Sequence, residues 1–339
     1  MSAQIFGLDI GRSFIKVVQV EVSSGKKILK AAYSLQSPGD GIQSEQVEDL
    51  AKVSEAISKC QKAAKIDSGK CNISLIESQV VTRFIQLPNL TDRELSSAIN
   101  WEAEQYIPLP LRDVNLQYKV LTRPDIGGDG KMDILLVAAP KRVIEKYVNL
   151  VRKAGLYVNA IETESASLAR SLTKSDDPPT LIVSMGAVST ELVIAVRGNV
   201  YFTRSIATGG VNLTRAIMTE FNLPQNQAEE YKQTYGLLDD KLSGKVAAVI
   251  KPIWDILISE ILKSLEFMRS HVSGSNITRI VICGGGAYLP GLSQFLAERT
   301  SLEVSLGDPW VDFVQEELIL KMPGQGSIYA VATGLALRT

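Results

Sequence analysis

Asp9, Gly11 and Lys16 form the first pattern along the chain that could bind a ligand. They lie in IFGLDIGRSFIKVVQV, residues 5–20, which predicts an apolar strand, a tight turn at Gly11 and a second apolar strand. A carboxylate at the end of a buried strand needs a cation or hydrogen-bond donors beside it. Gly11 lets backbone N–H groups approach an anion, and Lys16 adds a positive charge at the same end. The stretch could hold nucleotide phosphates, with Asp9 on the water shell of Mg²⁺; it could also be an ordinary hairpin.

Two further glycine patterns follow later in the chain. The stretch LIVSMGAVSTELVIAV, residues 181–196, repeats the first hairpin, and Gly186 follows Gly11 by 175 residues. Gly284–Gly286 come after an apolar strand expected at 279–283 and before an expected helix. Without side chains, this loop lets a flat base and its ribose lie against the backbone, although it could also be a flexible turn.

Length and composition restrict the class of protein. A chain of 339 residues is too long for one ordinary core, so two or more domains are expected. With 45% hydrophobic and 22% charged residues, and no apolar run of about 18–20, it has the composition of a soluble globular protein. A net charge of −1 without a long basic block argues against nucleic acid as a partner. Cys60, Cys71 and Cys283 lack metal or redox spacing, and the early first strand leaves no room for a signal peptide, which together predict a reducing cytoplasm.

The expected elements place these glycine patterns in two layered halves, with a different unit inside the first. Apolar residues at helical spacing predict a helix over 46–64, and Thr91 with Glu94 forms a capping-box pattern. The order β-α-β-β-α-β between 80 and 161 predicts an inserted α+β subdomain of about 80 residues. The expected strands there are 80–87, 115–122, 132–138 and 156–161, and the helices start after Thr91 and at Pro140.

The segment WEAEQYIPLPL, residues 101–111, is the most individual part of this insert. An aromatic pair, Trp101 and Tyr106, precedes Ile107, Pro108 and Pro110, and this predicts a rigid, partly apolar surface loop. Such a loop can dock an extended peptide. The alternative is a helix end that packs back onto its own subdomain.

Two phosphate hairpins and a late glycine-rich strand–loop–helix follow the order of the actin-like ATPase superfamily, which the sequence resembles over its whole length. WEAEQYIPLPL, the preceding TRFIQLP and the later TESASLARSL look like the PilM family, the actin-like cytoplasmic proteins of type IV pilus assembly and relatives of FtsA. The resemblance implies an α/β, actin-like (ribonuclease H-like) fold with duplicated domains around a nucleotide cleft and an inserted α+β subdomain. The expected division is 1–78 for the first part of domain I, 79–160 for the insert, 161–177 for a connecting helix, and 178–339 for domain II, whose last helix returns to domain I.

The same resemblance implies ATP and Mg²⁺ as ligands, with Asp9 as the residue for the metal. Glu229 and Lys232, on an expected helix at 225–235, would meet the ribose, and Lys263 and Ser264 would border the adenine. Glu229 and Lys232 could equally lie on a solvated face, and Gly209 and Gly210 could belong to a plain loop. The nucleotide-binding candidates are Asp9, Gly11, Arg12, Ser13, Lys16, Gly186, Thr190, Gly209, Gly210, Glu229, Lys232, Lys263, Ser264, Gly284, Gly285 and Gly286.

The resemblance also implies a protein partner, the short cytoplasmic N-terminus of the inner-membrane protein PilN. Trp101, Tyr106, Ile107 and Pro108 are the candidate peptide-binding residues. The protein would then be cytoplasmic and peripheral to the inner membrane through this partner, without inserting into the membrane itself. It would link envelope proteins to the cytoplasmic motor ATPases of the pilus.

One departure from the superfamily pattern bears on catalysis. Ser184 stands where many relatives have an aspartate that helps to hold Mg²⁺ or to orient water, and a hydroxyl cannot supply that charge. Tight nucleotide binding with slow or no turnover is therefore expected, and no catalytic residue is assigned, although Asp9 and Glu164 are acids near the expected cleft. Two alternatives remain. One is an FtsA-like filament former; such proteins end in an amphipathic membrane-targeting helix, whereas this chain stops after its last core helix. The other is a small-molecule kinase, which needs a catalytic acid in the second half, where Ser184 stands.

Overall fold

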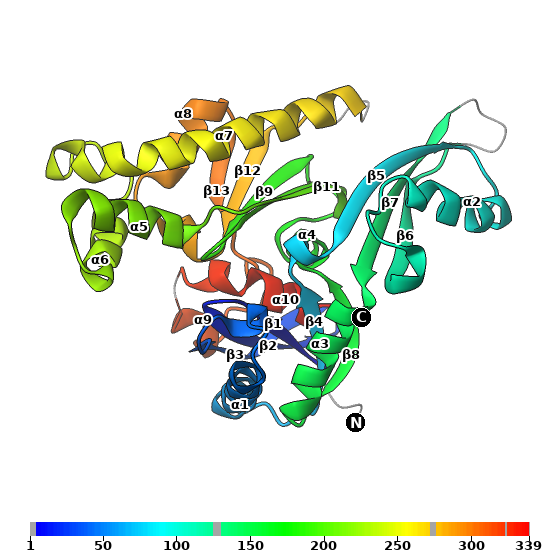
Figure 1. The fold of residues 1–339 in the computed structure, drawn as a ribbon, viewed down its shortest axis with the longest axis horizontal. Coiled ribbons are helices and arrows are strands. Elements are labelled where there is room, and N and C mark those ends of the chain that lie inside the picture. Colours follow the sequence, from blue (N-terminus) through cyan, green and yellow to red (C-terminus); the bar gives the residue numbers. More distant parts are fainter. Residues whose placement is uncertain (1–4, 125–129, 272–275, 323, 339) are drawn as a thin grey trace.

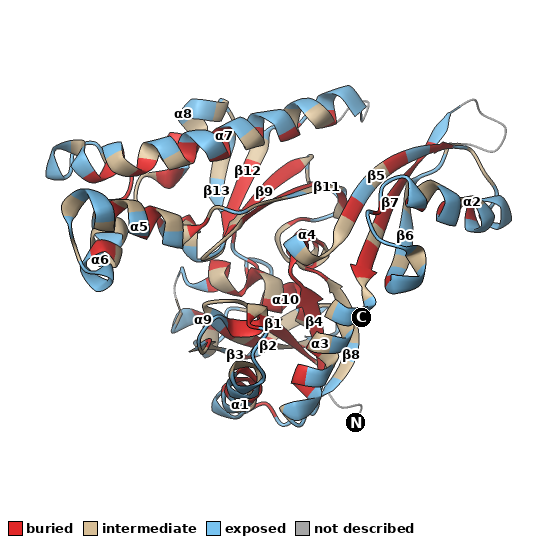
Figure 2. Cartoon of the chain, viewed as in Figure 1, coloured by how far each residue is buried: buried red, intermediate tan, exposed pale blue. Residues whose placement is uncertain are grey.

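The computed structural model describes residues 5–124, 130–271, 276–322 and 324–338. Two layered α/β halves face each other, and a smaller sheet with its own helix projects from one of them (Figure 1). The strands at the centre of each half are buried, whereas the outer faces of the surrounding helices are exposed (Figure 2). Within the described residues, no helix combines the length and the hydropathy needed to cross a bilayer.

The first half is built on β1 (Phe6–Ile10), β2 (Phe14–Ser23), β3 (Lys26–Gln36), β4 (Lys70–Leu75) and β8 (Tyr157–Thr163). Their order in the sheet is β3-β2-β1-β4-β8. β1 and β2 form the predicted antiparallel hairpin, in which Asp9 lies opposite Lys16. Helices α1 (Val47–Ala63) and α3 (Lys141–Lys153) contact each other and share one apolar core with the strands.

The second half repeats this topology. Its strands are β9 (Thr180–Met185), β10 (Thr190–Val196), β11 (Asn199–Ile206), β12 (Arg279–Cys283) and β13 (Glu303–Leu306), in the order β11-β10-β9-β12-β13. The central strand of each sheet therefore pairs antiparallel with the next strand along the chain and parallel with a later one. This repeat in space confirms the duplication predicted from the two glycine hairpins.

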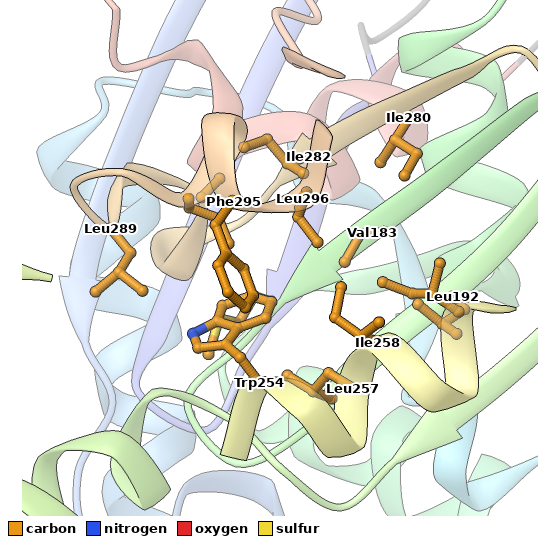
Figure 3. Close-up of a cluster of buried hydrophobic side chains, with 14 of the residues drawn as sticks. Val183, Leu192, Trp254, Leu257, Ile258, Ile280, Ile282, Leu289, Phe295 and Leu296 are labelled. Atoms are coloured by element: carbon orange, nitrogen blue, oxygen red, sulfur yellow. The ribbon is translucent and has the colours of Figure 1, made fainter. Parts of the chain in front are cut away.

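Four longer helices surround the second sheet: α5 (Gly210–Phe221), α6 (Gln225–Tyr235), α7 (Lys245–His271) and α8 (Leu292–Thr300). Trp254 of α7 is fully buried in the core beneath them. Its ring stands edge-on to Phe295 of α8, with the centroids 6.4 Å apart, beside Leu257 and Leu289 (Figure 3). The apolar stripe predicted along α7 is thus a core contact.

The insert differs from the expected β-α-β-β-α-β unit. Its sheet has the order β5-β7-β6, from β5 (Val81–Pro88), β6 (Val114–Thr122) and β7 (Lys131–Pro140), with α2 (Asp92–Glu104) packed on it. The capping box of Thr91 and Glu94 opens α2 as predicted. The next helix and strand, α3 and β8, belong to the first half, because β8 pairs with β4 and α3 buries its apolar face against α1. The insert was expected to cover residues 79–160, but the residues of that range that follow β7 belong to the first half.

Two helices connect the halves below the cleft: α4 (Glu164–Leu172) and α10 (Ala330–Ala336). They cross with backbone in contact, since a Cβ placed on Gly334 would lie 2.0 Å from the Ser167 carbonyl oxygen. Arg170 joins them as well, donating to the Gly334 carbonyl (2.8 Å) and pairing with the buried Glu162. The remaining short elements are η1 (Gly41–Gln43), η2 (Glu77–Gln79), η3 (Leu111–Asp113), η4 (Leu242–Gly244), η5 (Gly285–Tyr288), α9 (Glu317–Leu320) and η6 (Gly326–Tyr329).

Candidate functional site

A cavity of about 820 Å³ lies between the two halves, within the size range of small-molecule sites. Its walls come from both hairpin turns, from the β12–η5 loop, and from α4, α5 and α6. The structure thus brings together segments that lie far apart in sequence. The predicted residues that line the cavity are Asp9, Gly11, Arg12, Ser13, Lys16, Gly186, Gly210, Glu229, Lys232, Gly284, Gly285 and Gly286.

The first hairpin supplies a buried ion pair to this cavity. Lys16 Nζ donates to Asp9 Oδ2 over 2.8 Å, as the cross-strand register requires. Burial acts to lower the pKa of Lys16, but the Asp9 carboxylate outweighs it and the pKa is raised. The Gly11 N–H closes the turn by donating to the Phe14 carbonyl (3.1 Å). Lys16 therefore stays charged beside Asp9, at the edge of the cavity.

Arg12 and Ser13 form the turn itself and line the cavity. The Arg12 guanidinium pairs with Asp40 (2.7 Å) and donates to Gln43 Oε1 (3.2 Å), a residue that also lines the cavity. These contacts hold the Arg12 side chain against Asp40 and the η1 segment at the edge of the cavity.

The second hairpin is closed in the same way and supports the start of α5. Gly186 N–H donates to the Ser189 carbonyl (2.9 Å), and Gly210 N–H donates to the Gly186 carbonyl (3.0 Å). A Cβ on Gly209 would lie 2.6 Å from the Ala187 carbonyl carbon, so this close approach requires glycine. Thr190 Oγ1 donates to the Thr208 carbonyl (2.7 Å). Gly209 and Thr190 are not among the described residues that line the cavity, but their contacts hold its wall in place.

Lys232 is a cation on the opposite wall, to which Arg215 of α5 also belongs. Its Nζ donates to Glu229 Oε2 (2.7 Å), to Thr214 Oγ1 (2.9 Å) and to the Gly210 carbonyl (3.2 Å). Burial acts to raise the pKa of Glu229, but hydrogen bonds from Lys232, Thr214 and Gln233 outweigh it and the pKa is lowered. These hydrogen bonds keep the Glu229 carboxylate ionised and hold it beside Lys232 at the cavity wall that α5 and α6 share.

Lys263 and Ser264, predicted beside the adenine, do not line the cavity in the described structure. Lys263 is exposed and pairs with Glu260 (2.9 Å), and Ser264 is buried with its hydroxyl donating to the Glu260 carbonyl (2.8 Å). The period of α7 fixes this outcome, because it places Lys263 on the exposed face and Ser264 on the buried face together with Ile261 and Met268.

The glycine loop after β12 packs on the end of β9. Gly284 has φ 81°, and a Cβ there would lie 2.6 Å from the Met185 carbonyl oxygen. A Cβ on Gly286 would lie 2.4 Å from Met185 Sδ. Tyr288, which follows in the same loop, also lines the cavity and donates its hydroxyl to the Gly324 carbonyl (2.6 Å). Tyr288 was not predicted from the sequence, although its position two residues after Gly286 could have indicated it.

Two further carboxyl groups line the cavity: Glu164, which was expected near the cleft, and Glu191, which was not predicted. Burial, followed by the charges of Asp9 and Glu191, raises the pKa of Glu164 well above its usual range. Burial also raises the pKa of Glu191 to about 7, with the Ser205 hydroxyl opposing the shift. The cavity is thus lined by two carboxyl groups whose pKa values burial raises.

The candidate peptide-binding residues divide between surface and core. Trp101 is 73% exposed, Tyr106 is 41% exposed and Pro108 is exposed. Ile107 is buried in the core of the insert, next to the α2 core residues, so its side chain is not offered to a partner. Tyr118 on β6 is a further exposed aromatic of the insert, which its strand pattern did not single out.

Comparison with known proteins identifies the family. The model of the family "Type IV pilus assembly protein PilM" matches residues 7–339. The chain belongs to this family. A solved PilM-PilN type IV pilus biogenesis complex contains a chain that is 30% identical, with a TM-score of 0.82 over 99% of this chain and 98% of that one.

More distant relatives share the fold. The cell division protein FtsA of Streptococcus pneumoniae is 22% identical over 342 residues, covering 89% of this chain and 75% of that protein. Ethanolamine utilization protein EutJ of Salmonella typhimurium is 24% identical over 152 residues, so the match spans only about half of that relative (48%) and 45% of this chain. MreB5 of Spiroplasma citri, solved with AMPPNP, matches with a TM-score of 0.56 at 15% identity over 98% of this chain. These neighbours confirm the predicted actin-like fold.

Proposed function

We propose that this protein is an ATP-binding scaffold of the type IV pilus assembly platform, which holds the cytoplasmic N-terminal peptide of a PilN-like inner-membrane protein. The observation that carries the proposal is the cavity between the two glycine hairpins, with Lys16 on one wall and Lys232 on the other. Membership of the PilM family and the match to a chain of a PilM-PilN complex support it.

ATP suits the charges and shape of the cavity. Lys16 and the two hairpin turns would meet the phosphates, and Lys232 with Glu229 would meet the ribose. The loop Gly284–Gly286 would leave room for the base, because close packing on Met185 excludes side chains at two of its three positions.

Mg²⁺ would be held mainly by the nucleotide and by water. Among the described residues, no group of three or more Asp, Glu, His or Cys is placed to bind a metal ion on its own. Mg²⁺ keeps several waters in such sites and is bound through one or two carboxylates plus phosphates. Asp9, buried at the end of β1 beside Lys16, is the carboxylate in position to accept from one of those waters.

Slow turnover is part of the proposal. Ser184 lines the cavity and carries no charge, so it cannot supply the carboxylate that would help to hold Mg²⁺ or to orient water there. ATP would then act as a ligand that favours closure of the two halves over the α4–α10 crossing.

The exposed aromatic residues at the end of α2, Trp101 and Tyr106, are the proposed anchors of the peptide. Through that peptide the protein would sit at the cytoplasmic face of the inner membrane, in reach of the pilus motor ATPases.

The test is a calorimetric titration with the N-terminal PilN peptide of the same organism, with and without Mg-ATP. One-to-one binding that weakens about tenfold or more in Trp101→Ala and Tyr106→Ala is expected. Tyr157→Ala is the matched control, because Tyr157 is 75% exposed on β8, outside the inserted sheet. Absence of peptide binding in both nucleotide states would refute the PilN part of the proposal.

An FtsA-like filament former is the second candidate, favoured by the similarity to FtsA over most of the chain. Sedimentation with Mg-ATP and electron microscopy of the pellet distinguish the two, since the scaffold stays in the supernatant.

A further inference from the structure

One edge of the first half, opposite the cleft, collects lysine and arginine side chains. β1, β4 and β8 run parallel, and Asp9, Ile76 and Glu164, at or just after their carboxyl ends, line the cavity. The segments that lead into β4 and β8 therefore lie at the far edge of the sheet, where the Tyr157 N–H donates to the Gly69 carbonyl (2.7 Å). The tip of the β2–β3 hairpin lies at this edge too, because β2 runs antiparallel to β1. Five strands side by side make the edge about 20 Å wide.

These segments are strongly basic. Residues 21–30, 62–70 and 152–157 contain eight cations and two acids, a net charge of +6 in a chain whose net charge is −1. One of the acids, Glu21, pairs with Lys30 (3.5 Å). The other cations form no ion pair within the part of the chain that the structure describes, and all but Lys27 are exposed. We call these seven residues the basic edge: Lys26, Lys27, Lys62, Lys65, Lys70, Arg152 and Lys153.

Helix ends account for only part of this charge. Lys62 lies in the last turn of α1, and Arg152 and Lys153 lie in the last turn of α3, where cations stabilise the helix dipole. Lys65 lies in the loop after α1, and Lys70 opens β4, so neither has a helix end to stabilise. Their charge is therefore available to an anionic ligand outside the chain.

Two exposed apolar side chains accompany the cations. Tyr157 is 75% exposed and is the strand partner of Lys70, and Val22 is 62% exposed opposite Lys27. A tyrosine ring among lysines suits the head-group region of a bilayer, where the ring and the lysine stems meet apolar surface and the ammonium groups meet phosphates. The basic edge has a single arginine among its lysines, which favours lipid over nucleic acid, for which arginine is the preferred residue.

We propose that the basic edge rests on the anionic phospholipid head groups of a membrane surface, with no segment inserted into the bilayer. The cleft, at the opposite ends of the same strands, then faces away from the membrane and stays open to nucleotide. This inference goes beyond the proposed function, because the contact needs neither the PilN peptide nor ATP. It would add a second attachment to the one that the peptide provides.

The experiment is flotation of the full chain with vesicles, without peptide or nucleotide. Vesicles of phosphatidylcholine alone are compared with vesicles in which about a third of the lipid is phosphatidylglycerol. Binding to the anionic vesicles and not to the neutral ones is expected. Raising the salt from about 0.1 M to about 0.5 M should abolish it, because ions screen charges at an exposed surface.

Two double variants locate the contact. Lys65→Gln with Lys70→Gln should weaken binding to the anionic vesicles about twentyfold, since each lysine near such a surface strengthens binding about fivefold. Both residues are exposed and outside the helices, so the fold should tolerate the change. The matched control is Lys131→Gln with Lys245→Gln, which removes the same charge from exposed lysines on β7 and α7 and should bind like the unaltered chain.

Absence of vesicle binding, equal binding to neutral and anionic vesicles, or an equal loss in both double variants would each overturn the inference. Binding of a duplex oligonucleotide that depends on Lys65 and Lys70, without binding of vesicles, would assign the edge to nucleic acid and overturn it as well. None of these results touches the proposed function, which is tested separately by the titration with peptide and Mg-ATP.

Discussion

Replacing Glu191 by glutamine should stabilise the protein at alkaline pH, and the gain should shrink as the pH falls. Burial raises the pKa of this carboxyl from 4.5 to about 7. A carboxyl whose pKa is higher in the folded state favours folding in its neutral form. Its contribution is therefore fully present below the unfolded-state pKa and is lost as the pH rises through the folded-state value.

The magnitude follows from these two values. At pH 8 the ionised Glu191 lowers the free energy of unfolding by about 3 kcal/mol relative to a side chain that stays protonated. The reason is that its pKa rises from 4.5 to about 7, and one pH unit corresponds to about 1.36 kcal/mol. At pH 5 most of the folded chains still hold the proton on Glu191, and the free energy of unfolding is lowered by only about 1 kcal/mol. Glutamine keeps the shape without titrating, so the stability difference between variant and parent should grow by about 2 kcal/mol from pH 5 to pH 8.

Urea unfolding at pH 5, 6, 7 and 8, followed by far-ultraviolet circular dichroism without nucleotide, measures this difference. Glu145→Gln on the exposed face of α3 is the control and should follow the parent at every pH. A difference between Glu191→Gln and the parent that stays constant from pH 5 to pH 8 would refute the reasoning, because it would mean that Glu191 titrates alike in the folded and unfolded chain.

Three further predictions follow from contacts in the structure. Gly334→Ala should lower the thermal midpoint strongly, since its Cβ would meet backbone of α4 at 2.0 Å, whereas Gly285→Ala, with open space around its Cβ, should unfold like the parent. Asp9→Ala should abolish the tightening of ATP binding by Mg²⁺ that calorimetry measures. It should also lower the free energy of unfolding by about 3–5 kcal/mol, because Lys16 is left buried without its partner. Ile107→Ala should lower the free energy of unfolding, measured in urea, by about 2–5 kcal/mol. A loss of this size is expected for a buried side chain and not for a surface anchor.

The local features of this protein follow from its amino-acid sequence alone. Alternating apolar residues around Gly11 and Gly186 specify two hairpins, and the structure has both, with the same turn hydrogen bond in each. The capping box at Thr91 and the apolar stripe of α7 were equally predictable. These features depend on residues a few positions apart, so their physical cause is contained in the sequence pattern. The resemblance to the actin-like superfamily then ordered the elements into two halves around a cleft.

Tertiary structure decided the rest, because each remaining point depends on contacts between distant segments. Nothing local indicates that β8 pairs with β4 rather than with the inserted sheet, or that Ile107 is buried while Trp101 is exposed. Lys263 was assigned to the cleft by resemblance, and the rotation of α7 about its own axis turned it away. Glu191 became visible as a cleft residue only when the β9–β10 register placed it opposite Ser184, on the wall of the cavity. Register and burial are properties of the assembled sheet, and a pattern along one strand does not contain them.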